Sequence, residues 1–173
     1  MTIHASHPFP TPEDPVRRLR GRLGGRVSLW TTGGEGSAAS PSSASQAGLT
    51  VSSVMVANGD PARVLGLLDP DSDLRDVLEV TGVAVVQLLH WQHRGLAEAF
   101  GGTAPAPGGP FRSGDFTRTD WGPRLADAST WTGVRVESIV PVGWSVLATC
   151  VVERLEVGDD EQPLLHRRGR YTR

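Results

Sequence analysis

A cluster of hydroxyl side chains and a run of arginines are the residues of this sequence best suited to chemistry by type and spacing. Thr50, Ser52 and Ser53 stand together in the strand-like segment GLTVSS, residues 48–53. Hydroxyl groups donate and accept hydrogen bonds, so the cluster could hold a polar ligand, although such residues are also ordinary components of strands. Near its end the chain carries the basic segment HRRGR, residues 166–170, whose guanidinium groups suit a phosphate.

Other familiar chemistry is missing from the sequence. There is no Gly-x-Gly-x-x-Gly that opens a helix, no P-loop and no Gly-x-Ser-x-Gly. His90 and His93 are three residues apart, as metal ligands can be, but their flanks supply no third ligand, so no metal site is predicted. The single cysteine, Cys150, lies in an apolar segment, which favours a buried structural thiol over a nucleophile and excludes an internal disulfide.

Length and composition indicate one globular domain and exclude several classes of partner. The chain has 173 residues, a net charge of −2 and a pI near 6.2, which does not fit a nucleic-acid-binding protein. No apolar run approaches the roughly 18 residues that suggest a membrane span. The N-terminus lacks the features of a signal peptide, so we expect a cytoplasmic protein. With 21 Gly and 13 Pro, long irregular connections are expected rather than a helix bundle.

The patterning predicts a loose arm over residues 1–13 and one folded domain over residues 14–173. The domain opens with a helix, in which Asp14 is the N-cap and Pro15 the first residue. The turn DPDSD, residues 69–73, supplies the N-cap of a second helix near 73–80, and a third helix is expected at 91–100. Residues 101–115 are too rich in Gly and Pro for regular structure. Strands are predicted at 26–32, 48–58, 61–68, 83–89, 132–137, 146–157 and 163–171.

This order of elements is mainly β, with two or three short helices. It lacks the alternation of strand and helix that would build a parallel sheet, and the spacing near the C-terminus is that of hairpins. Six or seven antiparallel strands in so short a chain favour a closed or nearly closed barrel.

Taken in order, the segments RVSLWTT, GLTVSS, PARVLGLL, VAVVQLL and PLLHRRGRY resemble the flavin reductase-like family of FMN-binding split barrels. The resemblance covers about residues 15–172. GLTVSS is its most specific part, and the final segment is the second. It implies an antiparallel split barrel that binds FMN, with FAD as the other candidate, and that uses NADH or NADPH as co-substrate. The flavin would carry the reaction, so no catalytic side chain is expected.

The resemblance also implies which residues form the site. In the family the segment equivalent to GLTVSS lies along the flavin, and the turn after the third strand helps to bind the flavin phosphate. The expected flavin contacts are therefore Thr50, Val51, Ser52, Ser53 and Ser72. The turn around Ser72 departs from the family by carrying Asp69, Asp71 and Asp73, which would repel a phosphate. Where the family often has a His before Arg-Gly-Arg-Tyr, this chain has Arg167, so Arg167 and Arg168 are the expected nicotinamide-binding residues.

The expected function is NAD(P)H-dependent flavin reduction by a homodimer, with a monooxygenase as a possible recipient of the reduced flavin. A different class remains open. The chain could be a split-barrel protein that binds flavin without reductase turnover, or a paralogue that has lost flavin. The acidic turn at 69–73 bears on this choice, because three carboxylates disfavour a phosphate unless backbone donors dominate.

Overall fold

The computed structural model describes residues 14–34 and 46–173, so the predicted arm at 1–13 lies outside the described residues. The helices are α1 (Pro15–Leu23), α2 (Asp73–Thr81) and α3 (Arg94–Phe100), with short 3-10 turns at Trp91–His93 and Pro110–Ser113. The strands are β1 (Gly25–Arg26), β2 (Ser28–Thr32), β3 (Ala47–Val51), β4 (Val54–Ala57), β5 (Arg63–Leu68), β6 (Val83–Leu88), β7 (Phe116–Thr119), β8 (Gly122–Leu125), β9 (Trp131–Val142), β10 (Ser145–Glu156), β11 (Leu165–Arg167) and β12 (Arg170–Thr172).

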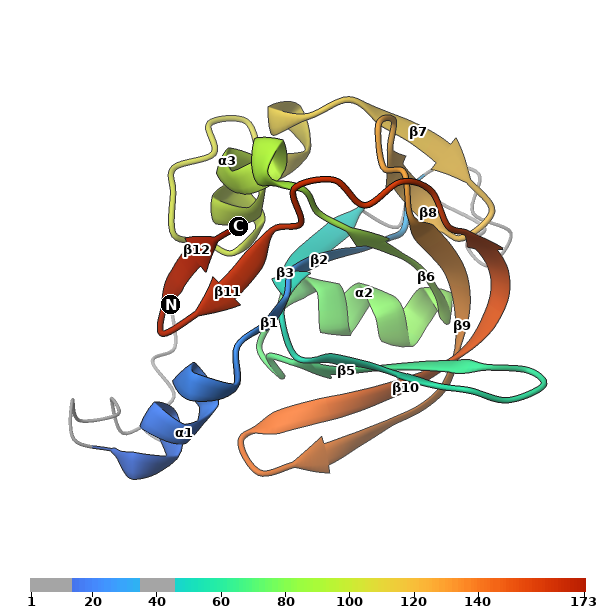
Figure 1. The fold of residues 1–173 in the computed structure, drawn as a ribbon. Helices are drawn as coiled ribbons and strands as arrows, with labels where there is room; N and C mark the ends of the chain where they lie inside the picture. The colour runs from blue at the N-terminus through green and yellow to red at the C-terminus, as the bar shows by residue number, and fades with distance from the viewer. Residues whose placement is uncertain (1–13, 35–45) are drawn as a thin grey trace.

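The main sheet is a curled, antiparallel sheet of seven strands in the order β3-β2-β6-β9-β10-β5-β4 (Figure 1). Its two edge strands, β3 and β4, are consecutive in the chain and are joined only by Ser52 and Ser53. The chain can pass from one edge to the other in two residues only because the sheet curls until its edges meet. The Leu67 amide donates to the Ser53 carbonyl over 3.0 Å at this closure. The predicted split barrel is confirmed, and its split lies at the serine pair.

The barrel encloses an apolar core built on Trp30, which is fully buried. Helix α2 supplies Leu74 and Leu78 to this core. Trp30 fits because the facing residue on β5 is Gly66, where a Cβ atom would lie 2.6 Å from the indole ring. The alternation predicted for 146–157 is also present, since Val146, Ala148 and Cys150 of β10 all point into the core. Figure 1 shows α2 lying against the curled sheet.

A second core cluster lies under α3 and the C-terminal hairpin. Phe100 of α3 packs edge-to-face on Phe111 and Phe116, with ring centroids 4.9 and 6.0 Å apart. Tyr171 of β12 is partly buried against the same cluster. The Gly- and Pro-rich segment 101–115 is thus fastened through Phe111, and it contains one short 3-10 turn rather than only irregular chain.

Three local predictions are corrected by long-range packing. The strand expected at 48–58 is broken into β3 and β4 at the barrel closure. The strand expected at 163–171 is a hairpin, β11–β12, that turns at residues 168–169. The segment expected as one strand at 26–32 divides into β1, which pairs with β11, and β2, which joins the barrel. In each case, pairing with a distant strand decides where the local pattern ends.

Over residues 14–34 and 46–173, no helix is long and apolar enough to cross a membrane.

The predicted buried thiol is confirmed, because Cys150 has no exposed surface. Burial, and secondarily the charge of Glu137, raises the pKa of Cys150 to about 12. The thiol therefore stays protonated at neutral pH.

Candidate flavin and nucleotide site

The expected flavin segment lies at the split of the barrel, on edge strand β3 and the two serines that follow it. An edge strand presents backbone N–H and C=O groups that no neighbouring strand uses. Ser52 and Ser53 are half-buried, and within the described part of the chain neither hydroxyl makes a hydrogen bond to the protein. Half-buried hydroxyls without protein partners are groups that a polar ligand can satisfy.

The hydroxyl of Thr50, two residues earlier, already has a partner. It donates to the carbonyl of Ala97 over 2.8 Å and so ties β3 to the last turn of α3. Val51 is buried, and its carbonyl accepts a hydrogen bond from the Ser28 hydroxyl over 2.8 Å. Thr50 and Val51 therefore position the segment, whereas Ser52 and Ser53 keep their hydroxyls free for a ligand.

The acidic turn follows β5, close to the serine pair. The Ser53 carbonyl bonds to Leu67, one residue before β5 ends. Ser72 is the N-cap of α2: its hydroxyl donates to the Asp69 carbonyl over 2.7 Å and accepts from the Arg75 amide over 3.3 Å. The predicted cap is confirmed, but this hydroxyl is already used within the protein. An anion here would depend on the backbone N–H groups of the first helical turn.

Hairpin β11–β12 lies beside the serine pair, with β1 between them. Gly25 pairs with His166 of β11, and a Cβ atom on Gly25 would overlap the carbonyl oxygen of Ser52. A side chain at the neighbouring Gly24 would meet Arg167, whose Cγ would lie 3.5 Å away. The glycine pair therefore lets the serine pair and the basic hairpin approach each other closely.

The pairing of the hairpin decides which way its side chains point. His166 is opposite Tyr171, and their rings meet edge-on with centroids 5.6 Å apart on the side that faces the second core cluster. Arg167 is opposite Arg170, so these two side chains leave the opposite face. Burial, and next the charge of Arg20 on α1, lowers the pKa of His166. Arg168 does not continue the alternation expected for a strand, because it is in the turn.

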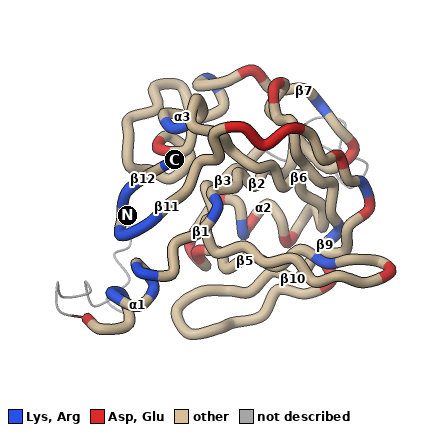
Figure 2. The backbone as a smooth tube through the Cα atoms, in the orientation of Figure 1, with Lys and Arg blue, Asp and Glu red and all other residues tan. Residues whose placement is uncertain are grey.

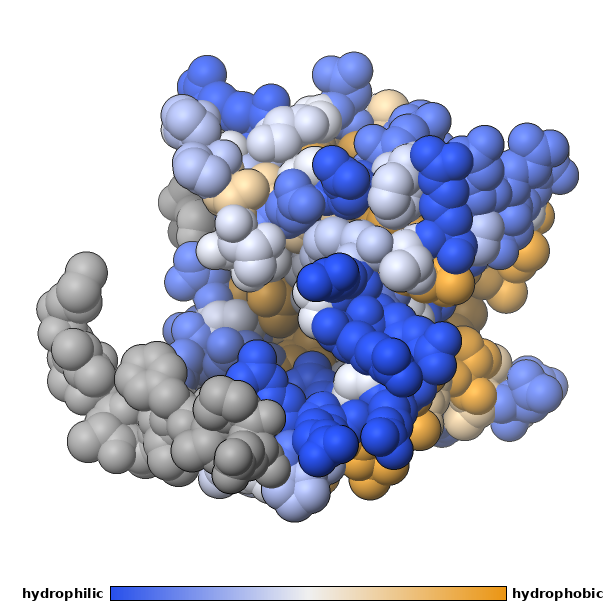
Figure 3. All heavy atoms as spheres, turned by 60° about the vertical axis from the view of Figure 1, so that its left-hand side comes forward, coloured by the Kyte–Doolittle hydropathy of each residue, from blue (hydrophilic) through white to orange (hydrophobic). Residues whose placement is uncertain are grey.

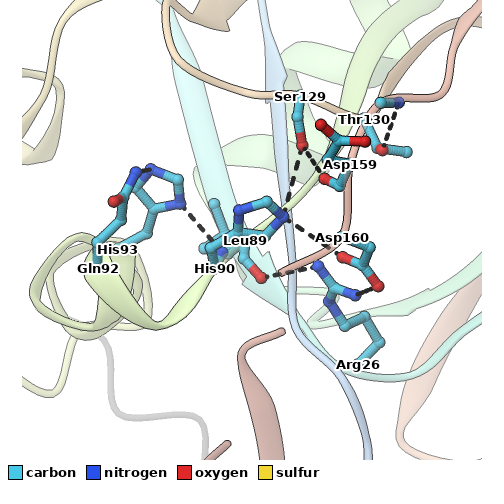
Figure 4. A network of polar contacts seen from close by, with 10 residues as sticks. Arg26, Leu89, His90, Gln92, His93, Ser129, Thr130, Asp159 and Asp160 are labelled. Carbon is cyan, nitrogen blue, oxygen red and sulfur yellow. Dashed lines mark hydrogen bonds and ion pairs between the residues drawn. The ribbon is translucent and has the colours of Figure 1, made fainter. Parts of the chain in front are cut away.

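A polar network fixes β1 and, through it, the hairpin (Figure 4). Arg26 of β1 donates to Asp160 over 2.7 Å and to the Leu89 carbonyl over 3.1 Å. The hydrogen bond from Arg26 is the main cause that lowers the pKa of Asp160. His90 adds a contact, with its Nε2 3.4 Å from Asp160. The network holds segment 157–164, which leads into β11, against the end of the barrel.

The two histidines considered as metal ligands have separate acidic partners. His93 Nε2 lies 3.1 Å from Asp127, while His90 faces Asp160. The other ring nitrogen of His93, Nδ1, accepts a hydrogen bond from the His90 amide over 3.1 Å. His93 is therefore bonded on both sides of its ring. In residues 14–34 and 46–173, no group of three or more His, Cys, Asp or Glu side chains could hold a metal ion.

The curled seven-stranded antiparallel sheet, whose edges meet at the serine pair beside a helix N-terminus and a basic hairpin, has the architecture of a split barrel. Residues 20–173 match the family model described as the flavin reductase like domain. The chain therefore belongs to the flavin reductase-like family and is a flavin reductase-like oxidoreductase, as the sequence motifs indicated.

Individual relatives agree with this assignment. The FMN reductase (NADH) RutF of Cronobacter sakazakii is 30% identical over 160 residues, which cover 92% of this chain and 91% of that protein. The NADH:FAD oxidoreductase of Streptomyces globisporus C-1027, solved with NAD and FAD fragments, aligns with a TM-score of 0.78 at 19% identity over 96% of each chain. The styrene monooxygenase flavin reductase of Pseudomonas putida S12 aligns with a TM-score of 0.75 at 24% identity, covering 91% of this chain and 95% of that one. At these identities the two solved structures support the fold.

The structure thus brings most of the predicted site residues into one region. Ser52 and Ser53 are close to β1 and, across it, to Arg167, while Ser72 stands beyond the end of β5. Sequence reasoning included Arg170 in the basic segment, but it did not place Arg170 or Thr172 on the same face as Arg167. The signal was present in the pair Arg168-Gly169, since a glycine between two strand-like stretches indicates a tight turn that doubles the chain back.

Proposed function

We propose that this protein reduces FMN with NADH or NADPH, and that the flavin ring lies along β3 and the serine pair. The observation that carries the proposal is the pair of half-buried hydroxyls, Ser52 and Ser53, which have no protein partner at the split of the barrel. They lie next to a free strand edge and within one strand of a basic hairpin. Such a surface offers donors and acceptors to the polar rim of a ring without covering its faces.

The residues present fit an isoalloxazine ring, because short hydroxyls and edge-strand backbone groups match its carbonyl and N–H edge. When bound, flavin would supply the redox chemistry, as the acceptor of a hydride from the reduced nicotinamide. No side chain of the chain is assigned a catalytic role. Its residues bind and orient the two ring systems, which is where the rate enhancement would arise.

The chain's own groups divide this work. Ser52 and Ser53 donate to the ring, while Thr50 and Val51 hold β3 in place through their bonds to α3 and β2. Arg167 and Arg168 face solvent and attract the phosphates of the nicotinamide substrate. At the turn after β5, the backbone of the first turn of α2 would receive the flavin phosphate, with Ser72 shaping that turn as its cap.

FMN is the flavin we favour, because the curated relative that shares 30% identity is named for FMN and NADH. FAD remains the other candidate, since the Streptomyces protein is named for FAD. A cytoplasmic location belongs to the same proposal, because the reaction draws on the nicotinamide dinucleotides of the cell. We also propose that a monooxygenase receives the reduced flavin, which is supported by the name of the Pseudomonas protein, a styrene monooxygenase flavin reductase.

A homodimer is part of the proposal, and exposed apolar residues support it. Met55 and Val56 on edge strand β4 are 60% and 67% exposed, and Trp144 at the tip of hairpin β9–β10 is 64% exposed. A monomer would leave this apolar surface and an open sheet edge in water. We expect Val56→Glu to shift the protein toward monomer in light scattering. A wild-type protein that is monomeric at micromolar concentration would contradict the dimer.

The experiment that tests the function is a steady-state assay of NADH and NADPH oxidation with FMN, combined with FMN titration by fluorescence quenching. We expect saturable oxidation with at least one nucleotide and tight FMN binding. Binding of FMN with no oxidation of either nucleotide would favour the alternative, a split-barrel flavin protein without reductase turnover. Absence of flavin binding would contradict the proposal altogether.

A further inference from the structure

The outward face of hairpin β11–β12 forms a pocket lined by arginines. Arg167, Arg168, Arg170 and Thr172 line this open pocket, which has a volume of about 510 Å³. Thr172 is two residues after Arg170 on β12, so its hydroxyl is on the same face as Arg170 and the opposing Arg167. Three guanidinium groups and one hydroxyl supply only hydrogen-bond donors and one weak acceptor. The lining therefore suits an anion rich in oxygen.

Two unfavourable local features accompany the placement of these arginines in the hairpin. Arg167 and Arg170 are direct cross-strand partners, and like charges in that relation destabilise a hairpin. Arg168 is in the left-handed region with φ of 52°, followed by Gly169 with φ of 76°, as in a type I′ turn. Arg is an unusual residue at such a position, where Asn, Asp or Gly is preferred. A bound anion would offset the repulsion.

Two carboxylates close to the hairpin in sequence or in space are already paired with other arginines. Asp160 bonds to Arg26, and Glu98, whose charge is felt at Tyr171, lies 3.8 Å from Arg94. Among the described ion pairs none involves Arg167, Arg168 or Arg170. Figure 2 shows the basic residues of β11–β12 and α1 as neighbouring blue segments, and Figure 3 shows strongly hydrophilic side chains around a hollow on the face that contains them.

We infer that this pocket binds the 2′-phosphate of NADPH and makes the protein prefer NADPH over NADH. This rests on the proposed function, in which the hairpin meets the nicotinamide dinucleotide. A phosphate monoester carries about 1.5 to 2 negative charges at neutral pH and offers three acceptor oxygens, which match three arginines and a hydroxyl. NADH has a neutral ribose hydroxyl in that place. It would leave the like-charged pair Arg167 and Arg170 without a counter-ion.

Binding of adenosine phosphates separates this inference from the reductase activity, because it needs no turnover. The probes are 2′,5′-ADP and 5′-AMP, which differ only in the 2′-phosphate, each titrated by calorimetry. We expect 2′,5′-ADP to bind at least about tenfold more tightly, a difference of about 1.4 kcal/mol. Arg170→Gln should remove most of that difference, whereas Arg170→Lys, which keeps the charge without the planar fork, should retain part of it.

Matched variants control for general loss of charge and for folding. Arg154→Gln removes an exposed strand arginine that pairs with Glu156 on β10, and it should leave the ratio of the two affinities unchanged. Arg168→Asn keeps a residue that tolerates the left-handed turn while removing the guanidinium, so the hairpin should still form. In steady-state kinetics, the ratio of kcat/KM for NADPH to that for NADH should fall about tenfold in Arg170→Gln.

Several outcomes would overturn the inference. Equal affinity for 2′,5′-ADP and 5′-AMP in the wild-type protein would show that no 2′-phosphate site exists, even if NADH is oxidised normally and the proposed function stands. Competition between FMN and 2′,5′-ADP would instead assign the arginines to the flavin phosphate. Conversely, if neither nucleotide is oxidised, the reductase proposal fails, and the calorimetric comparison still decides whether the hairpin selects the 2′-phosphate.

Discussion

The barrel split and hairpin β11–β12 lie on either side of the Gly24-Gly25 pair and differ in charge. The serine pair at the barrel split is neutral and leads toward an acidic turn, whereas hairpin β11–β12 carries three unpaired arginines in the described structure. Gly25 touches both, because it packs on Ser52 and pairs with His166. Under the proposed function, the difference divides recognition between the regions: the split and the adjoining turn hold the flavin, and the hairpin attracts the phosphates of the nicotinamide dinucleotide.

The largest effect is expected from Gly25→Ala, which acts on the junction between the two regions. The added methyl group would overlap the Ser52 carbonyl, so β1 and the serine pair must separate. Overpacking of this kind costs about 1–3 kcal/mol in the free energy of unfolding, measured by urea denaturation. FMN affinity should fall as well.

The matched control for this change is Gly95→Ala on α3, where a Cβ atom would meet nothing within 4 Å. There the same substitution should stabilise the protein by about 0.5–1 kcal/mol, because alanine favours the helix. Equal changes in the free energy of unfolding for the two variants would contradict the proposed close contact between β1 and the serine pair.

The second prediction concerns the neutral region alone. Ser52→Ala combined with Ser53→Ala should weaken FMN binding by about 1–3 kcal/mol, because ring groups lose their partners. Fluorescence quenching measures the change, and Ser138→Ala, an exposed serine of β9, is the control. Unchanged FMN affinity in the double variant would show that Ser52 and Ser53 do not bind the flavin.

The third prediction concerns the acidic turn. Asp73 is the first residue of α2, beside the N–H groups assigned to the flavin phosphate. Asp73→Asn should raise the affinity for FMN by a few-fold and leave the affinity for riboflavin unchanged. This change corresponds to the roughly 0.3–1 kcal/mol that a charge contributes at a helix end. Equal changes for FMN and riboflavin would show that the phosphate lies elsewhere.

The smallest effect is expected from pH at the hairpin. The pKa of His166 lies below its ordinary value of 6.5, because burial and Arg20 disfavour the charged ring. The unfolded chain therefore binds a proton at His166 more tightly than the folded chain does. The contribution of neutral His166 to the free energy of unfolding is present above about pH 6.5. It is lost as the pH falls toward the lower pKa of the folded state. The fall in Tm between about pH 7.5 and about pH 5.5 should shrink in His166→Gln. An unchanged fall in Tm would contradict this.

The parts of the fold that depend on nearby residues were predictable from sequence. Helix α2 runs from the Ser72 cap to the left-handed Gly82, and both ends are set by residues within the segment itself. The break at Ser52 and Ser53 was not predictable in this way, because it arises where two sheet edges meet after pairing with distant strands. The expectation that residues 50–53 contact flavin came from the motif resemblance rather than from the local pattern.

The same distinction applies within the site. The partner of the Thr50 hydroxyl is 47 residues away on α3, so sequence alone could not tell that this hydroxyl is occupied while its neighbours are free. The face of Arg170 was not predicted, because residues 163–171 were interpreted as one strand; Gly169 indicated a turn, but Arg168 is not a residue that turn rules favour at a left-handed position. The basic composition of the segment was evident, but the shared face of Arg167 and Arg170 follows only from their pairing.

The most direct test of the central claim is anaerobic stopped-flow mixing of the FMN-loaded protein with one equivalent of NADH or NADPH. The visible absorbance of oxidised flavin reports its reduction, and about one flavin should be reduced per nucleotide because the transfer involves two electrons. We expect loss of this absorbance in a single turnover, faster with NADPH at low nucleotide concentration. Persistence of the absorbance with both nucleotides, in a protein shown to hold FMN, would contradict it.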